Sequence, residues 1–559
     1  MKPRSEHQAG AALAILAVAM IVVAALPVAS SAGVITVSVS GGGDYTTLGG
    51  AFAAAADGDT ILVRPGVYLG ADNRGLDFAG RSLTVRSTDG PEQTRINCKD
   101  EDRAFIVDGV DDPPATIEGL TIQYAHAHDD TVWTYDGYGG AVYCYASSVT
   151  LANMIFRENS CDQSGGAVFM SGGGAYEILG CDFIDNSAPE VGSDGGAVLV
   201  NASDSFTLDN SDFVGNTAVH GGGALRVEIG VPVTVSDARF VGNEADFGGA
   251  ISMSSVNGEH TIDGCLFEGN TARHWGGALS LVWGSMPTIR NCAFLANVSR
   301  YKGSALGLSR GAPGLVERCT FWQNETQETD GATISFWDDT SVIRDCTFLE
   351  NSAPTGGVLY CDGGASPTVG NCIFAFTSAG RVIYCDGDDC EPELAFSCVY
   401  ENAGGDTMCG DVHELIFEDP LVCLGSLPDF TLEDCSPCIG AGEGGTTIGA
   451  GEPGCPCGDP TTVIDTPDRL VFLGATPNPA NETVGLHYSS GITPELSASI
   501  FTAAGRLVRV LKVRPPSQGR GVLEWDGLDS QGRRVAPGVY FVEMRTAETR
   551  ARGEVVLLR

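Results

Sequence analysis

The fold of this chain is decided by a stretch that repeats itself: CLFEGNTARHWGGAL (265–279), CAFLANVSRYKGSAL (292–306) and CTFWQNETQETDGAT (319–333). Each copy carries an F-x-x-N motif, and most carry a G-G-A-type turn before an apolar run. The eight motif phenylalanines are separated by 27 residues except for one step of 30. They are Phe156, Phe183, Phe213, Phe240, Phe267, Phe294, Phe321 and Phe348. So regular a period indicates a repeat architecture.

The content of one repeat selects the architecture. Each copy holds short β-type runs, glycines at expected bends and no helical periodicity. A repeat of 27 residues is too short for a four-stranded propeller blade and lacks the helix of a leucine-rich repeat. It fits one coil of a parallel β-helix, whose coils stack about 4.8 Å apart. The fold class is therefore all-β. The phenylalanines are expected to stack inside, and the asparagines to form a hydrogen-bonded column at a bend.

Cysteines form another column of this repeat. In-register neighbours in a parallel sheet hold their Cβ vectors side by side, which is poor geometry for a disulfide. A line of ligands also suits no tetrahedral metal site. Buried thiols that fill space are the favoured interpretation. The column consists of Cys181, Cys265, Cys292, Cys319, Cys346 and Cys372.

The repeat resembles known families. F-x-x-N followed by G-G-A or G-G-I resembles the repeat of polymorphic outer-membrane proteins, and the coil is similar to the pectin-lyase-like right-handed β-helix superfamily. The resemblance is close over 139–381 and looser over about 60–455. It implies a right-handed parallel β-helix over 33–460. A short helix over 47–56 is expected to cover the first coil, and 419–450 is similar to the closing coil of such proteins. A C-terminal translocator barrel exports that outer-membrane family, but the residues after 460 are too few for one.

The last part of the chain, 461–559, has another composition. ELSASIFTAAGRLVRVLK (495–512) alternates around an Ala-Gly turn and predicts a hairpin. The run from Trp525 to Tyr540 resembles the immunoglobulin-like domain of flagellar hook-capping proteins and the related C-terminal sorting domains of type IX secretion. The resemblance implies a small β-sandwich that serves in surface attachment or release, with the outer-membrane export machinery as partner. A plain accessory sandwich is the alternative.

The amino terminus predicts export. Lys2 and Arg4 precede the apolar run AALAILAVAMIVVAAL (11–26), and SSA (30–32) offers a small-residue cleavage site. This pattern is typical of a secretory signal peptide over 1–32. A retained membrane anchor is the alternative, although the helix-breaking Pro27 favours cleavage. We find no other hydrophobic span, so no transmembrane segment is expected in the mature protein, which is predicted to be secreted or held at a bacterial outer-membrane surface.

Charge and cysteine content narrow the choice of partners. The chain has a net charge of −39, distributed as −41 over 1–460 and +2 over 461–559. So acidic a surface repels phosphate backbones, which argues against nucleic acid. Nine cysteines lie within the cysteine-rich coils 385–457. A zinc ribbon of Cys435, Cys438, Cys455 and Cys457 is conceivable, but disulfides are favoured in an exported protein.

No catalytic constellation is recognisable. The N-T-D and G-H-G motifs of polygalacturonases and the arginine motif of pectate lyases have no counterpart. Adjacent acids arise by chance in a chain with 71 Asp and Glu residues. His274 and Trp275 occupy a turn position that varies from coil to coil, so neither is expected to be catalytic. No cofactor is required, and Ca²⁺ is the one ion considered.

Two irregularities interrupt the repeat. The first is a protruding loop within 125–140, where a ligand or a metal ion can bind; a solvated loop is the alternative. Its candidate residues are His126, His128, Asp129, Asp130, Trp133, Tyr135 and Asp136. The second is CDGDDC (385–390), an acidic turn expected to be stapled by its two cysteines. Its carboxylates Asp386, Asp388 and Asp389 are a candidate calcium site, without a full ligand set.

A third candidate lies on the coil surface. Counting five residues on from each G-G-A alanine reaches mostly small residues, but three successive coils place Trp283, Arg310 and Trp337 there. In register, the two indoles are expected about 9–10 Å apart with the guanidinium between them. Sugar rings stack on exposed aromatic faces, and arginine can also bond an acidic sugar. The alternative is that the three residues only cover a gap in the coil surface.

These observations predict a non-catalytic binding or adhesion module for a polysaccharide or a cell-surface glycan. A polysaccharide lyase or glycoside hydrolase of the pectin-lyase-like superfamily is the alternative, and a metal-stabilised structural stalk is the third interpretation.

Overall fold

The computed structural model describes residues 32–557 except for a set of gaps. The gaps are 111, 130–136, 229–231, 255–258, 285, 311–313, 329–330, 406–407, 424–429, 452, 457–470, 477–479, 481–482, 490–495, 503–505, 514–519 and 546–549. The predicted signal peptide therefore lies outside the described residues, apart from its last position.

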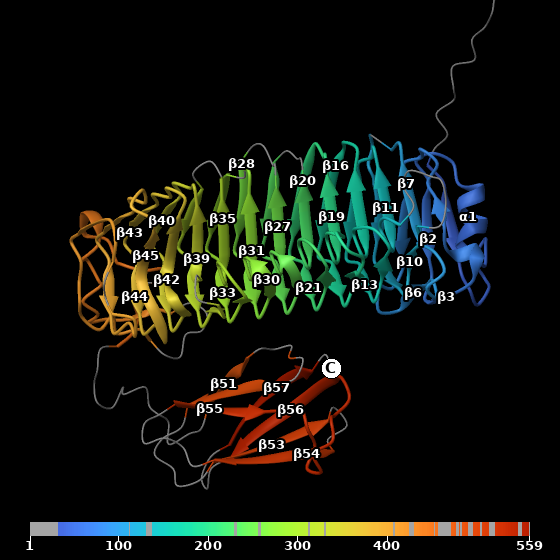
Figure 1. Cartoon of the computed structure of the whole chain (residues 1–559). Coiled ribbons are helices and arrows are strands. Elements are labelled where there is room, and N and C mark those ends of the chain that lie inside the picture. Colours follow the sequence, from blue (N-terminus) through green and yellow to red (C-terminus); the bar gives the residue numbers. More distant parts are fainter. Residues whose placement is uncertain are drawn as a thin grey trace, which may run out of the picture.

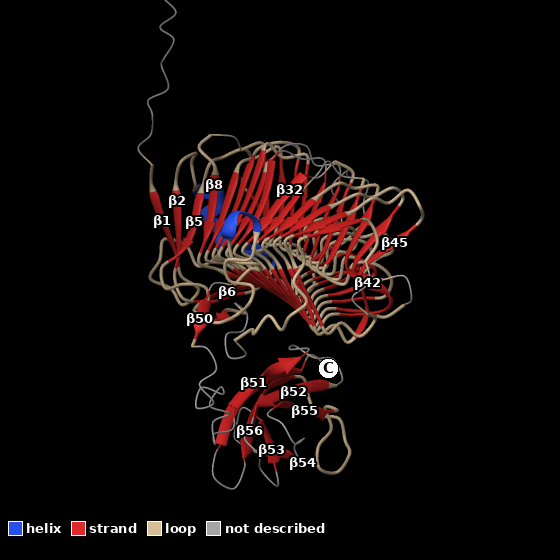
Figure 2. Cartoon of the chain, turned by 90° about the vertical axis from the view of Figure 1, so that its left-hand side faces the viewer, coloured by secondary structure: helices blue, strands red, loops and turns tan. Residues whose placement is uncertain are grey.

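The chain from Val34 to about His413 winds into a parallel β-solenoid (Figure 1). One coil consists of β28 (Glu259–Asp263), β29 (Leu266–Glu268), β30 (Thr271–Trp275) and β31 (Leu279–Val282). These strands pair in parallel with β32 (Met286–Arg290), β33 (Ala293–Leu295), β34 (Val298–Ser299) and β35 (Leu306–Ser309) of the next coil. The result is three long sheets of 15, 13 and 20 strands. Figure 2 looks along the rod, where the coils nest behind one another.

The predicted phenylalanine column is confirmed. The rings from Phe156 to Phe374 stack one coil above the next, with centroids 4.5–5.0 Å apart and planes within 4–13°. All of these rings are fully buried in the main core. They lie at the centre of strands such as β29, whose neighbouring residues Leu266 and Glu268 point outward. The spacing is that of strands in a sheet, because the backbone fixes the rise of each coil.

The asparagine column is also confirmed, and it is fully hydrogen-bonded. The Nδ2 of Asn270 donates to Asn297 Oδ1 at 2.9 Å and to the Phe240 carbonyl at 2.9 Å. Its Oδ1 accepts from the Nδ2 of Asn243 at 2.9 Å and from the Asn243 backbone N–H at 3.0 Å. Each side chain thus bonds forward and backward along the rod, and the amide is completely buried. Buried polar groups are tolerated when they are satisfied in this way.

The cysteine column consists of free, buried thiols, as predicted. Burial raises the pKa of Cys181 to about 12. It also raises the pKa of Cys292, Cys319 and Cys346 well above the usual thiol range. A thiol that cannot ionise is a poor nucleophile and a poor metal ligand. These cysteines therefore act as small core side chains.

The amino-terminal end of the rod is covered by helix α1 (Leu48–Ala54). The Thr47 side chain caps the helix by accepting a hydrogen bond from the Gly50 N–H at 3.3 Å. Leu48 and Phe52 are buried, and the Phe52 ring meets Phe78 edge-on at 5.4 Å. The helix thus shields the first coil, which otherwise presents an open core.

The segment after β48 (Asp411–His413) does not add another coil to the three long sheets. It folds back onto the outer face of the 13-stranded sheet, where Phe430, Leu432 and Ile448 pack in one cluster with Trp322 and Ile373. The Ala450 N–H donates to Thr347 Oγ1 at 2.9 Å. The outward side chains of the sheet in these coils are apolar, and the returning segment buries them.

Disulfides stabilise the cysteine-rich end, as the sequence favoured over a zinc site. The expected pairing of Cys385 with Cys390 is wrong. Cys385 bonds to Cys409, and Cys423 bonds to Cys455. Cys390 keeps a free thiol, so the acidic turn 385–390 is not stapled by its own cysteines. Cys385 pairs across coils because β45 (Ala379–Asp386) ends beside the loop that carries Cys409.

The carboxy-terminal domain is a separate β-sandwich with its own core. A three-stranded sheet holds β51 (Val471–Thr476), β52 (Val484–Ser489) and β55 (Arg520–Trp525). A four-stranded sheet holds β54 (Leu507–Val513), β53 (Leu496–Thr502), β56 (Gly538–Arg545) and β57 (Arg550–Leu557). The predicted hairpin is the antiparallel pair β53–β54. Trp525 is buried at the centre, and its Nε1 donates to the Leu528 carbonyl at 3.0 Å.

Within the described part of the chain, no helix has the length and apolar character that crossing a membrane requires.

Candidate functional site

An aromatic and cationic patch lies on the outer face of the 20-stranded sheet. Along β35 the side chains of Leu306 and Leu308 enter the core, so Gly307 between them faces outward. A Cβ at Gly307 would lie 3.6 Å from the Cβ of Trp275. The chain therefore brings Trp275 over a position without a side chain, and small residues such as Ser280 and Ser335 occupy the neighbouring outward positions.

Trp283 and Arg310 occupy matching positions just after β31 and β35, because Val282 pairs with Ser309. Both have positive φ, 60° and 50°, in the tight turn that follows each strand. The prediction that Trp337 continues this column is wrong. Trp337 is in register with Ser309 as the last residue of β39 (Ala332–Trp337), and Asp338 takes the column position.

The shift of Trp337 has a simple cause. Leu306 pairs with Ile334, so Thr333 rather than Ala332 occupies the place of Ala305. Between its F-x-x-N motif and Ile334, the coil that contains Phe321 has one residue more than the preceding coil has between its motif and Leu306. Counting five residues on from Ala332 therefore ends one residue before the column position. Because side chains alternate along a strand, the shift places Trp337 on the outward face of the sheet instead of in the turn.

Of the predicted residues Trp283, Arg310 and Trp337, the last two are in contact. The Arg310 Cζ lies 4.6 Å from the centroid of the Trp337 ring. Trp337 also meets Trp275 edge-on, with centroids 5.8 Å apart. Trp283 is 61% exposed and Trp337 is 37% exposed. Trp337 and Arg310 thus form a partly exposed aromatic and cationic pair, and Trp283 lies exposed in the turn before Arg310 in the column.

The patch continues toward the next coils with residues that the sequence did not single out. Lys302 Nζ lies 4.6 Å from the centroid of the Tyr360 ring and pairs with Asp362 Oδ2 at 2.7 Å. The Tyr360 hydroxyl donates to Asp386 Oδ2 at 2.6 Å. Asp362 and Asp386 are in-register neighbours at the ends of β42 (Ser352–Asp362) and β45. Two carboxylates thus border the aromatic side chains.

We call this set the aromatic patch. It comprises Trp275, Trp283, Lys302, Arg310 and Trp337, together with Tyr360, whose buried ring packs against Lys302. The sequence predicts Trp275 only as a variable turn residue and does not single out Lys302 or Tyr360, because all three stand at other places in the repeat than the counted column. A bulky residue directly before the small-residue turn is the one sequence signal for Trp275 and Lys302.

The neighbouring His274 belongs to a different stack of side chains. Its ring lies between Phe247, at 5.2 Å, and Tyr301, at 5.6 Å. His274 is in a coil-to-coil column of side chains, and it contacts no carboxylate among the described residues.

The other predicted sites differ in how far they assemble. His126 and His128 lie close together beside Asp162 of the next coil, and Asp129 follows them. Asp130, Trp133, Tyr135 and Asp136 fall outside the described residues. Asp386, Asp388 and Asp389 are exposed and form no group of converging ligand atoms in the part of the chain that the structure describes. The Asp386 carboxylate turns to Tyr360 instead.

Two family models match this chain. A model of the right-handed beta helix region matches residues 103–294 and 257–394, which together cover more than half of the 559 residues. The chain belongs to the right-handed β-helix family. A model of the FlgD Ig-like domain matches residues 482–550.

Comparisons with individual proteins say less about this chain than the family models do. No curated protein matches this β-helix protein. Among solved structures, tailspike protein 3 of bacteriophage CBA120 is similar with 11% identity and a TM-score of 0.25. The match covers 66% of this chain and 57% of the tailspike chain, so this β-helix protein spans less than two thirds of that relative.

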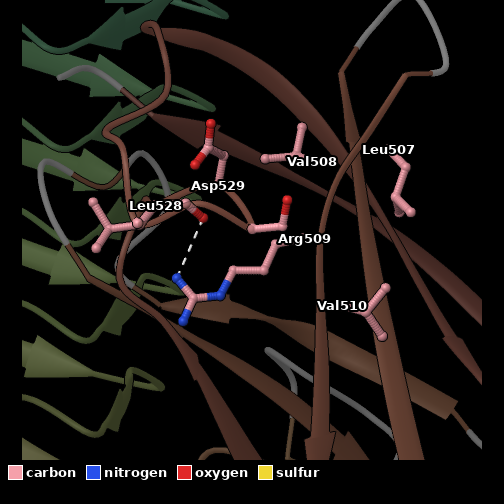
Figure 3. Close-up of a pocket in the computed structure, with 8 residues that line it drawn as sticks. Leu507, Val508, Arg509, Val510, Leu528 and Asp529 are labelled. Carbon is pink, nitrogen blue, oxygen red and sulfur yellow. Dashed lines mark hydrogen bonds between the residues drawn. The ribbon is translucent and has the colours of Figure 1, made fainter.

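The FlgD Ig-like domain of this β-helix protein carries a hollow of about 400 Å³. Arg509 lines it and donates to the Leu528 carbonyl at 3.4 Å (Figure 3). Arg509 also donates to Asp526 Oδ1 at 2.6 Å. Asp529 accepts hydrogen bonds from the backbone N–H groups of Arg533 and Gln531, which hold the pKa of its carboxyl below the usual range. The Asp529 carboxylate thus stabilises the local turn.

Proposed function

We propose that this β-helix protein binds glycan through the aromatic patch, as a binding or adhesion module at the cell surface or in the secreted fraction. The observation that carries the proposal is the exposed Trp337 with Arg310 held 4.6 Å from its ring. An indole face binds the C–H face of a sugar ring, and the guanidinium can donate two parallel hydrogen bonds to the carboxylate of an acidic sugar.

The arrangement of the patch supports an extended ligand. Trp283 and Arg310 come from neighbouring coils, and Trp337 comes from the coil after them. Successive coils are about 4.8 Å apart, so these side chains span about 10 Å along the rod, the length of two sugar units. The rigid sheet beneath fixes the groups before binding, which lowers the entropic cost of association.

The test is to measure binding of the full chain to a panel of neutral and acidic polysaccharides, and then to repeat it with Trp283→Ala and Trp337→Ala. Each variant is expected to weaken binding of the recognised polysaccharide by about 1–3 kcal/mol, because a buried aromatic contact is lost. Phe541→Ala is the matched control. Phe541 is 45% exposed on the carboxy-terminal domain and is expected to leave the affinity unchanged.

Circular dichroism and melting temperature check that the variants keep the fold. Retention of full affinity by both tryptophan variants would contradict the proposal and leave the patch with a packing role.

A second candidate function is glycan cleavage, and the pair of acids favours it. Asp362 and Asp386 are in-register neighbours beside the aromatic side chains. Glycosidases use two carboxylates, one as acid and one as base or nucleophile. The same polysaccharide panel is assayed for chain cleavage with Asp362→Asn and Asp386→Asn. Cleavage that either variant abolishes would favour the hydrolase over the binding module.

We further infer that the chain is exported and that the FlgD Ig-like domain attaches or releases it at the outer membrane. Support comes from the apolar run after Lys2 and Arg4 and from the match over 482–550. Fractionation of cells that produce the full chain or 1–460 tests the second part. The full chain is expected in the outer-membrane or secreted fraction, and 1–460 in the periplasm. Identical distribution would contradict a sorting role.

A further inference from the structure

Two histidines and an aspartate meet on the surface of two neighbouring coils near the amino-terminal end of the rod, far from the aromatic patch. His126 lies on β10 (His126–Ala127) and pairs in register with Ser160 on β14 (Ser160–Cys161). His128 and Asp162 follow two residues later in their segments. Alternate residues of extended chain share a side, so two neighbouring coils present their side chains at one place.

The ligand atoms of this group converge. His126 Nε2 lies 3.0 Å from Asp162 Oδ1, and His128 Nδ1 lies 3.9 Å from Asp162 Oδ2. The two imidazole centroids are 4.1 Å apart. All three ligand atoms lie within 4.8 Å of one another, and in the described residues this is the group of three that does so. Such separations fit donors around one small cation.

Neighbouring groups orient the two imidazoles. The Nε2 of His128 lies 3.3 Å from the Asp100 carbonyl oxygen. A carbonyl can only accept, so this nitrogen carries the proton and leaves the Nδ1 lone pair facing Asp162. His126 Nε2 donates to the Asp162 carboxylate at 3.0 Å, and a bound cation would replace this proton. His126 Nδ1 lies 2.6 Å from Ser160 Oγ, which can then accept its N–H. The Asp129 N–H donates to Asp162 Oδ2 at 2.9 Å. Metal-binding histidines are held by outer partners of this kind.

We propose that His126 Nε2, His128 Nδ1 and the Asp162 carboxylate bind one divalent transition-metal ion, with Zn²⁺ as the expected class. Two imidazoles and a carboxylate are typical zinc ligands. Ca²⁺ and Mg²⁺ prefer sets made of oxygen ligands. The side chains of His128 and Asp162 are 45% and 33% exposed, so a fourth position is open to water or to a ligand oxygen. The ion ties β10 to β14, at the start of the insertion that interrupts the repeat.

The experiment uses the full chain without an affinity tag and Co²⁺ as the spectroscopic probe. Titration followed by visible absorption and by equilibrium dialysis is expected to show one Co²⁺ per chain at this site, displaced by Zn²⁺. His128→Ala and Asp162→Asn are expected to abolish the absorption. Ser160→Ala removes only the outer partner of His126 and is expected to weaken binding about 10–100-fold.

His274→Ala is the matched control, because this histidine stacks between aromatic rings and is expected to leave Co²⁺ binding unchanged. The conservative Asp162→Asn variant keeps the side-chain shape, and its circular dichroism establishes that the fold is intact. Absence of Co²⁺ binding in the parent chain would overturn the proposal. Equal binding in the parent, His128→Ala and Asp162→Asn would overturn it as well, as would displacement of Co²⁺ by an equal concentration of Ca²⁺.

Discussion

Replacing Phe267 with alanine is expected to lower the free energy of unfolding by roughly 3–5 kcal/mol. The ring is fully buried and stacks on Phe240 at 5.0 Å and on Phe294 at 4.9 Å. The truncation removes apolar contacts and leaves a cavity that the hydrogen-bonded coils on either side cannot close. Urea denaturation followed by circular dichroism measures the loss.

Phe417→Ala is the control for this change. Phe417 is 58% exposed, so its truncation is expected to change the free energy of unfolding by less than about 0.5 kcal/mol. A loss of under about 1 kcal/mol for Phe267→Ala would mean that the ring does not contribute to a packed core, and that result would refute the column.

Asn270→Asp is expected to cost roughly 3–5 kcal/mol at neutral pH, although the two side chains have the same shape. The native Nδ2 donates to Asn297 Oδ1 and to the Phe240 carbonyl. A carboxylate has no proton for either, so a buried negative charge faces two oxygen acceptors. The loss is measured against the parent chain at each pH.

The pH dependence follows from the same contacts. Burial and the facing oxygens raise the pKa of the introduced carboxyl above its unfolded value of about 4. The variant is therefore closest to the parent below about pH 4, where the carboxyl is protonated in both states, and it loses stability as pH rises through the folded pKa. Asn153→Asp is the control, since Asn153 is exposed and should show little change. If the difference in the free energy of unfolding between Asn270→Asp and the parent chain does not change with pH, the buried negative charge is not its cause.

The periodic features of this protein could be predicted from its sequence. A residue that recurs at the same place in each coil lies above its counterpart, because backbone hydrogen bonds fix the register of parallel strands. The Phe267 and Asn270 columns and the buried Cys292 column follow from this rule, and the antiparallel hairpin β53–β54 follows from its alternating pattern. Each of these inferences needed only the local period and the chemistry of one residue type.

The sites required the tertiary structure, because they join residues at different places in the repeat. Trp275 meets Trp337 only through the bend before β31 and the extra residue of a later coil, and neither is visible in the period. His128 and Asp162 converge because two coils set extended segments side by side at an insertion. The segment around Phe430 returns to the 13-stranded sheet because the outward side chains there are apolar. The sequence by itself determined the coil and its columns, since these depend on backbone register alone. Only the tertiary structure decided which surface side chains meet, since that depends on the path of each turn.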